Sequence, residues 1–188
     1  MFTTDIVTHR KFWSETVGLR LDHELDFGNG TLQYRYAAHD SVIKVNHHPH
    51  SFVPTPPTGY VGLTIARAGQ PAWEGRNPGG EFVRLVPPGT DGVVGIGVTV
   101  STLQPARMTD FFVDALEFER VGPQVARCGD SRLLVVVGAG GCEQVDYLGP
   151  TFRYLTIQIF DANDECAAIA KRGGRMAAAC TTLGTVAR

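Results

Sequence analysis

All six histidines of this chain lie within its first fifty residues, and His47, His48 and His50 form a local cluster. Imidazole nitrogens bind divalent metals such as Fe, Mn, Ni and Zn. Side chains alternate along a strand, so His48 would share a face with Lys44 and Asn46 if this stretch is a strand. One interpretation is therefore a site for one divalent metal at His48. The other is a polar strand end that runs into a proline-rich linker.

A second set of polar residues could line a pocket. Two strand-like stretches begin with tyrosine: Tyr-Val-Gly-Leu-Thr-Ile from residue 60, and Tyr-Leu-Thr-Ile-Gln-Ile from residue 154. Hydroxyl, amide and guanidinium groups can orient a small polar or aromatic ligand. We predict a pocket lined by Tyr60, Thr64, Arg84, Tyr154, Thr156 and Gln158, with Lys44 and Asn46. The alternative is that these residues face outward from a half-exposed sheet.

The composition restricts the class of protein. Of the 188 residues, 43% are hydrophobic and 19% charged, which is typical of globular chains. The net charge of -2 argues against binding to nucleic acid or anionic membranes. No apolar run is long enough to span a bilayer, and the first residues do not resemble a signal peptide. Because the four cysteines are widely spaced, we expect free thiols and a cytoplasmic protein.

The elements that must position these residues follow from periodicity and turn signals. Helices are predicted from about Ile6 to Val17, with Asp5 as cap and Gly18 as stop, from Pro105 to Leu116, and after a cap at Asn163. The first helix directs Ile6, His9, Trp13 and Val17 to one face, and the second directs Met108, Phe111, Phe112 and Ala115 to the core. Strands are predicted at 19–25, 31–38, 41–48, 60–66, 81–86, 93–100, 118–122, 124–128, 132–137 and 153–160. Residues 49–59 form a linker, and residues 69–80 form a polar, glycine-rich connection in which a full helix is not expected.

One combination of elements occurs twice. Asp40-Ser41 and Asp130-Ser131 are tight polar turns that each lead into an apolar strand, and each follows a helix and then strands. We therefore predict an α+β fold of repeated βαβββ modules, whose curled mixed sheets surround a cup. The terminal modules are incomplete. Residues 1–89 would form an N-terminal pair of modules, with a truncated first strand and a degenerate second module, and residues 90–188 a C-terminal pair with truncated last strands.

This pattern resembles the vicinal oxygen chelate superfamily, which includes glyoxalases, bleomycin resistance proteins and extradiol dioxygenases. The resemblance is carried by Phe12-Trp13 with Val17-Gly18-Leu19, by Phe111-Phe112 with Leu116-Glu117-Phe118, and by the stretch from Asn77-Pro78-Gly79-Gly80 to Leu85. It covers nearly the whole chain. It implies a divalent metal held by His or Gln on the first strand of a module and by Glu on its last strand.

At most of these ligand positions this sequence has a residue other than the His, Gln or Glu of the family. The first-strand positions fall near Tyr60, Gly95 and Tyr154, and the last-strand positions at Lys44, Arg84 and Leu134. Only Gln158, with a shifted register, is a ligand of the family type. The two strands that could still supply ligands are the first strand of the first module and the last strand of the fourth. We expect either a longer parent chain or a homodimer that completes the sheets.

Three functions remain open. The first is a metal-dependent enzyme that acts on a small molecule with adjacent oxygens, as a glyoxalase-type lyase or isomerase or a ring-cleaving dioxygenase. The second is a binding or resistance protein that captures a small ligand without metal. The third is a catalytically silent half of a larger dioxygenase-like chain. The fold does not choose among them.

Overall fold

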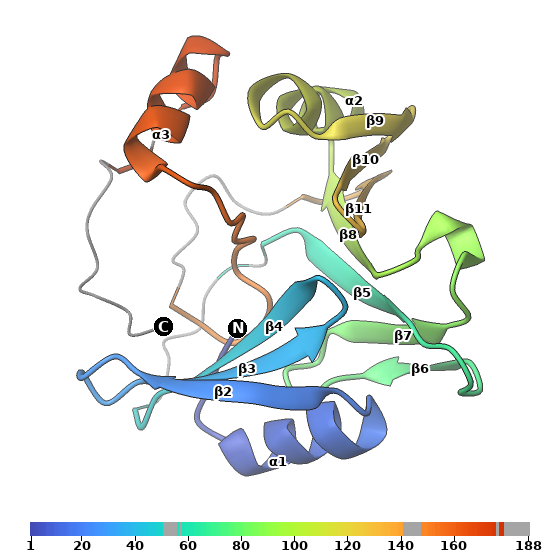
Figure 1. Ribbon diagram of the computed structural model, residues 1–188, viewed down its shortest axis with the longest axis vertical. Helices are drawn as coiled ribbons and strands as arrows, with labels where there is room; N and C mark the ends of the chain where they lie inside the picture. Colours follow the sequence, from blue (N-terminus) through green and yellow to red (C-terminus); the bar gives the residue numbers. More distant parts are fainter. Residues whose placement is uncertain (51–55, 57, 141–147, 176, 179–188) are drawn as a thin grey trace.

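The computed structural model describes residues 1–50, 56, 58–140, 148–175 and 177–178. It has two mixed sheets and few helices, so the predicted α+β class is confirmed (Figure 1). Over these residues no helix has the length and apolar character needed to cross a membrane. Within the described residues, Cys128 and Cys166 are not part of a disulfide.

The first module forms a four-stranded sheet in the order β1-β4-β3-β2, with β1 parallel to β4. Its helix begins where predicted, because the Asp5 carboxylate accepts a hydrogen bond from the Thr8 amide. Gly18, with a φ of 74°, lets the chain leave the helix in the left-handed region. The elements are β1 (Phe2–Thr3), α1 (Ile6–Lys11), the π-helical turn η1 (Phe12–Thr16), β2 (Arg20–Asp26), β3 (Leu32–Ala38) and β4 (Ser41–His47).

The third module repeats this topology. Its strands follow the order β8-β11-β10-β9, again with the first strand parallel to the last. Pro105 is at the start of its helix, as predicted. The elements are β8 (Ile96–Thr102), α2 (Pro105–Asp110), the π-helical turn η3 (Phe111–Ala115), β9 (Glu119–Gly122), β10 (Val125–Cys128) and β11 (Ser131–Val137). The repeated βαβββ unit inferred from the sequence is therefore present.

The second module keeps only three strands: β5 (Tyr60–Ala66), β6 (Trp73–Arg76) and β7 (Phe82–Val86). The order is β6-β7-β5, with β5 parallel to β7 and antiparallel to β8, so modules two and three share one seven-stranded sheet. The connection at 69–80, in which a full helix was not expected, contains the strand β6, which was not predicted. This short edge strand is fixed by nonlocal packing, since the ring centroids of Trp73 and Phe12 are 6.0 Å apart.

The fourth module is reduced to an extended segment and the helix α3 (Ala162–Lys171). The prediction of a strand at 153–160 is wrong. These residues alternate as in a strand, but they form no regular secondary structure. A strand forms only beside a partner strand. The edge strand of the first sheet, β1, has only two residues, which pair with Asn46 and His47 of β4, so it is too short to be the partner of residues 153–160. The cap of α3 is Asp161 rather than Asn163, since the Asp161 carboxylate accepts hydrogen bonds from the amides of Asn163 and Asp164.

The core consists of two clusters that pack the helices against the sheets. The larger one contains Trp13 of η1 together with Val45 of the first sheet and Ile65 of the second. The smaller one packs Met108 and Phe112 against β8 and β11. Phe111, predicted to face the core, is 42% exposed instead. Figure 1 shows α1 beneath the first sheet and α2 at the opposite end of the molecule. The division at residue 89 stays a prediction.

Candidate functional site

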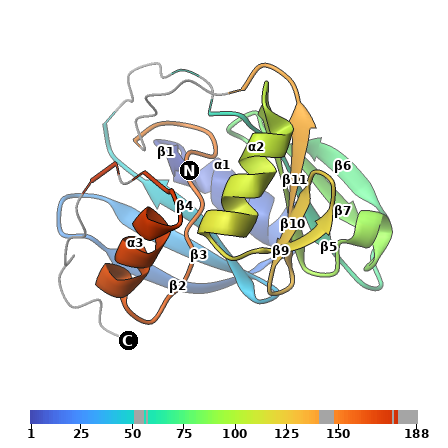
Figure 2. The same cartoon turned by 90° about the horizontal axis from the view of Figure 1, so that it is seen from above.

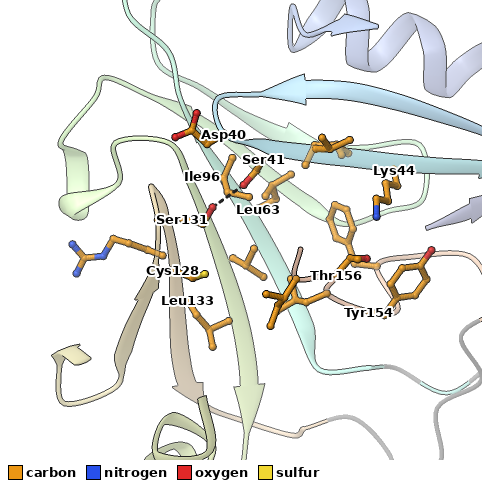
Figure 3. Close-up of a pocket in the computed structure, with 18 of the residues that line it drawn as sticks. Asp40, Ser41, Lys44, Leu63, Ile96, Cys128, Ser131, Leu133, Tyr154 and Thr156 are labelled. Carbon is orange, nitrogen blue, oxygen red and sulfur yellow. Dashed lines mark hydrogen bonds between the residues drawn. The ribbon is translucent and has the colours of Figure 1, made fainter. Parts of the chain in front are cut away.

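The repeated turns of modules one and three meet each other. The Asp40 amide donates to the Asp130 carboxylate at 3.1 Å, and the hydroxyls of Ser41 and Ser131 are 2.7 Å apart (Figure 3). Each turn is a two-residue connection between paired strands, and its first residue has a positive φ: 59° at His39 and 58° at Gly129. The contact joins the two sheets at equivalent points of the two modules.

A cavity of about 400 Å³ lies beside this contact, between the sheets and the segment that leads to α3. Part of its lining is apolar and comes from Leu63 on β5, Ile96 and Val98 on β8, and Leu133 on β11. The polar part includes Lys44, Tyr60, Tyr154, Thr156 and Gln158. An apolar enclosure with a few polar groups is typical of small-molecule sites, and the volume is within the range of roughly 300–1,000 Å³ that such sites have.

A β-bulge decides which residues of β5 reach this cavity. In the pairing of β5 with β8, Tyr60 lies opposite Val100 but Gly62 lies opposite Thr99, so one extra residue is inserted between them. Strand parity alone would put Tyr60 and Thr64 on the same face. Because of the bulge, Tyr60 faces the helix side and packs with Val100, whereas Thr64 lies on the other face beside Gly97.

Arg84 is also placed away from the cavity. It pairs with Thr64 across β7 and β5 and therefore shares the face opposite the helices. Its guanidinium is 3.5 Å from the carboxylate of Asp91, at the surface. Of the eight predicted pocket residues, five line the cavity: Lys44, Tyr60, Tyr154, Thr156 and Gln158. Thr64 and Arg84 do not line it.

Asn46 lies next to the cavity in a chain of hydrogen bonds. Its Oδ1 accepts from Nε2 of Gln33 at 2.8 Å, and its Nδ2 donates to the Tyr154 hydroxyl at 3.2 Å. Asn46 and Gln33 are both buried. This chain attaches the segment at 152–158 to the first sheet and fixes the position of the Tyr154 ring at one end of the cavity.

Sequence reasoning missed Arg35, which also lines the cavity. Arg35 on β3 lies directly opposite Lys44 on β4, so the two cationic side chains are neighbours on one face of the sheet. The hairpin turn between Ala38 and Ser41 sets this register, and it was the signal that could have identified Arg35. Lys44 is half-buried, and its pKa is lowered from the ordinary value, first by burial and then by the charge of Arg35.

The phenol of Tyr60 is largely shielded from water. Burial raises the pKa of Tyr60 to about 12, although a hydrogen bond with the backbone of Leu155 acts in the opposite direction. The hydroxyl of Tyr60 therefore stays protonated at neutral pH. It can orient a ligand as a hydrogen-bond donor but is not suited to act as a general base.

The residues at the metal positions of the resemblance do not fit a metal. Arg84 and Leu134, which occupy two of the last-strand positions, share one face of the seven-stranded sheet with Thr64 and Thr99, and none of the four is an imidazole or carboxylate ligand. His48 accepts a hydrogen bond at Nδ1 from the His50 amide, and it follows the end of β4. Within the described ranges, no three His, Cys, Asp or Glu side chains are grouped as metal binding requires.

Comparison with solved structures identifies the fold. No protein-family model matches the sequence, and a comparison with curated proteins finds no match. Two crystal structures of glyoxalase I mutants from Zea mays are similar, each with 12% sequence identity over 74% of this chain. Their TM-scores are 0.54 and 0.52, and the alignments cover 67% and 66% of the maize chains. At this identity the likeness concerns the fold alone: the chain has a glyoxalase-like fold.

Proposed function

We propose that this protein binds a small molecule, without a metal, in the cavity between its two sheets. The observation that carries the proposal is the composition of the cavity wall. Five residues predicted from sequence to contact a ligand lie together there, over an apolar surface of β5, β8 and β11. An enclosure of about 400 Å³ suits one small organic molecule.

The residues at the positions of the metal ligands favour ligand binding over metal-assisted chemistry. A vicinal-oxygen-chelate reaction needs imidazole and carboxylate ligands with open coordination positions. The corresponding face of the seven-stranded sheet carries threonine, glycine, leucine and arginine at those positions. The cavity is instead on the helix side of that sheet, where Tyr60 and Val98 project.

Binding of N-phenyl-1-naphthylamine, a neutral fluorescent probe, tests this proposal. We expect saturable binding that survives removal of metals with EDTA. Val98→Trp should abolish binding because the indole fills the cavity. Val94→Trp provides the matched control, since Val94 is 54% exposed and is not part of the wall. Binding that requires a stoichiometric metal, or that Val98→Trp leaves unchanged in a folded protein, would overturn the proposal.

A second measurement does not depend on a variant that must fold. Cys128 is exposed and belongs to the cavity wall, whereas Cys166 lies on α3. The probe should protect Cys128 from alkylation by iodoacetamide and leave the rate at Cys166 unchanged, as measured on separate peptides by mass spectrometry. Equal alkylation of Cys128 with and without the saturating probe would contradict binding in this cavity.

A glyoxalase-type lyase or ring-cleaving dioxygenase is the second candidate. The structural likeness to glyoxalase I from Zea mays favours it. It would require stoichiometric Fe, Mn, Ni or Zn in the purified full-length protein, with ligands from outside the described residues or from a partner subunit. Turnover of a substrate with adjacent oxygens that stops when the metal is removed would establish it in place of the binding function.

A further inference from the structure

We infer that the ligand of this cavity is a small organic anion, with its acid group against Lys44 and Arg35 and its apolar body on β5, β8 and β11. The inference rests on the proposed binding function and adds the chemical class and orientation of the ligand. It begins from the two cations, which are cross-strand neighbours of β4 and β3 and both belong to the cavity wall.

Within the described residues neither cation is in direct contact with a carboxylate, although the charge of Arg35 acts on Asp22 from a distance. Over the described part of the chain, no carboxylate forms an ion pair with either Lys44 or Arg35. The nearest strand, β2, carries Asp22, but its carboxylate already contacts Arg20 at 3.3 Å and His23 at 2.7 Å. Two like charges side by side and partly removed from water are unfavourable unless an anion joins them.

The donor atoms of Arg35 are correspondingly underused. Its Nε is buried without a hydrogen-bond partner, and its other recorded bond is a long one, 3.5 Å from NH1 to the Gln33 amide oxygen. Guanidinium and ammonium groups form their strongest hydrogen bonds with carboxylate, sulfonate or phosphate oxygens. The Tyr154 hydroxyl, held by Asn46, lies at the same end of the cavity as Lys44 and provides a further donor (Figure 3).

The acidic residues of the wall do not compete for this role. Asp40 lies at the far end of the cavity from Lys44 in Figure 3. The carboxylate of Asp130 already accepts hydrogen bonds from the Asp40 amide and the Ser131 hydroxyl. Between the two ends the wall is apolar, with Leu63, Ile96 and Val98. A cavity with a cationic end and an apolar middle is complementary to an amphipathic acid with an aromatic or branched body.

Two probes with the same ring system test the inference: 8-anilinonaphthalene-1-sulfonate, which carries a sulfonate, and neutral N-phenyl-1-naphthylamine. We expect the sulfonate to bind at least about tenfold more tightly, since hydrogen bonds to charged groups are worth that much. Lys44→Gln should weaken sulfonate binding about tenfold and binding of the neutral probe by no more than about twofold. Lys11→Gln on the exposed face of α1 is the matched control and should alter neither.

The outcomes separate the two proposals. If the neutral probe binds in the cavity and protects Cys128, but the sulfonate binds no better and Lys44→Gln has no effect, the anion inference is wrong and the binding function stands. If neither probe binds in the cavity, the binding function itself fails. Arg35→Gln repeats the test if Lys44→Gln does not fold, and a loss of sulfonate affinity with unchanged neutral binding again supports the inference.

Discussion

At the scale of single residues, ionisable side chains are partly or fully buried at two places, the cavity wall and α1, and the consequences differ. Lys44 and Arg35 line a cavity that a ligand can enter, so a bound anion can offset the cost of their burial. His9 has no such access, because it is 3% exposed within the first module and its Nδ1 has no hydrogen-bond partner. His9 therefore affects the stability of the fold, because it is the buried residue of α1.

His9 should make the protein sensitive to acid. Burial lowers the pKa of His9 to about 4, although the charge of Asp5 opposes this shift. The unfolded chain takes up the proton near pH 6.5, so stability is complete above that pH and falls as the pH drops toward 4. The free energy of unfolding should lose on the order of 2 kcal/mol between pH 8 and pH 5.

Urea unfolding of the wild type and of His9→Leu at several pH values measures this contribution. The variant should show a smaller loss between pH 8 and pH 5, because it removes the group that titrates. Parallel curves for the two proteins over this range would show that His9 is not the source of the acid sensitivity.

At the scale of elements, the fourth module is the least supported part of the described structure. The helix α3 has no buried residue, so apolar burial does little to hold it. Its docking depends on Arg172, whose Nε donates to the Ala115 carbonyl at 2.9 Å while NH2 pairs with Glu165 at 2.7 Å. The carbonyl of Ala115 is at the end of η3, where helical carbonyls lack partners within the helix.

Arg172→Gln should release α3 from η3. We expect amide exchange in α3 to become at least about fivefold faster, which corresponds to a loss of roughly 1 kcal/mol. Lys171→Gln removes a charge from an exposed neighbouring position and is the matched control. Similar exchange in the two variants would indicate that other contacts keep α3 in place.

At the scale of the whole molecule, two sheets with equivalent modules meet through equivalent turns. The Ser41 and Ser131 hydroxyls form this contact between residues ninety positions apart. Figure 2 shows the molecule from above, with β4 near the chain start and β11 beside β10. The cavity lies beside this junction, so its shape depends on how the two sheets are joined.

A double-mutant cycle measures this junction. Ser41→Ala and Ser131→Ala should each destabilise the protein, and the coupling between them should be about 0.5–1.5 kcal/mol, the usual range for one hydrogen bond. Thr8→Ala provides the control partner, because the Thr8 hydroxyl bonds to Asp5 and shares no partner with Ser41. Additive effects of the two serine substitutions would contradict the contact between the modules.

The sequence by itself determined the local elements and their repetition. The caps at Asp5 and Gly18, the proline at the start of α2 and the alternation along β3, β4 and β11 are short-range signals, and short-range sterics and hydrogen bonding decide them. From these the repeated βαβββ unit and the glyoxalase-like class could be predicted, and the structure bears both out.

Only the tertiary structure decided which of the predicted residues meet. A single bulge in β5 separates Tyr60 from Thr64, and the register of β3 on β4 brings Arg35 beside Lys44. The residues at 153–160 alternate like a strand but have no strand partner, so they cross the cavity as an extended segment. Pairing between distant strands depends on partners that no local window of sequence contains, and for this reason the composition of the cavity wall could be predicted only in part.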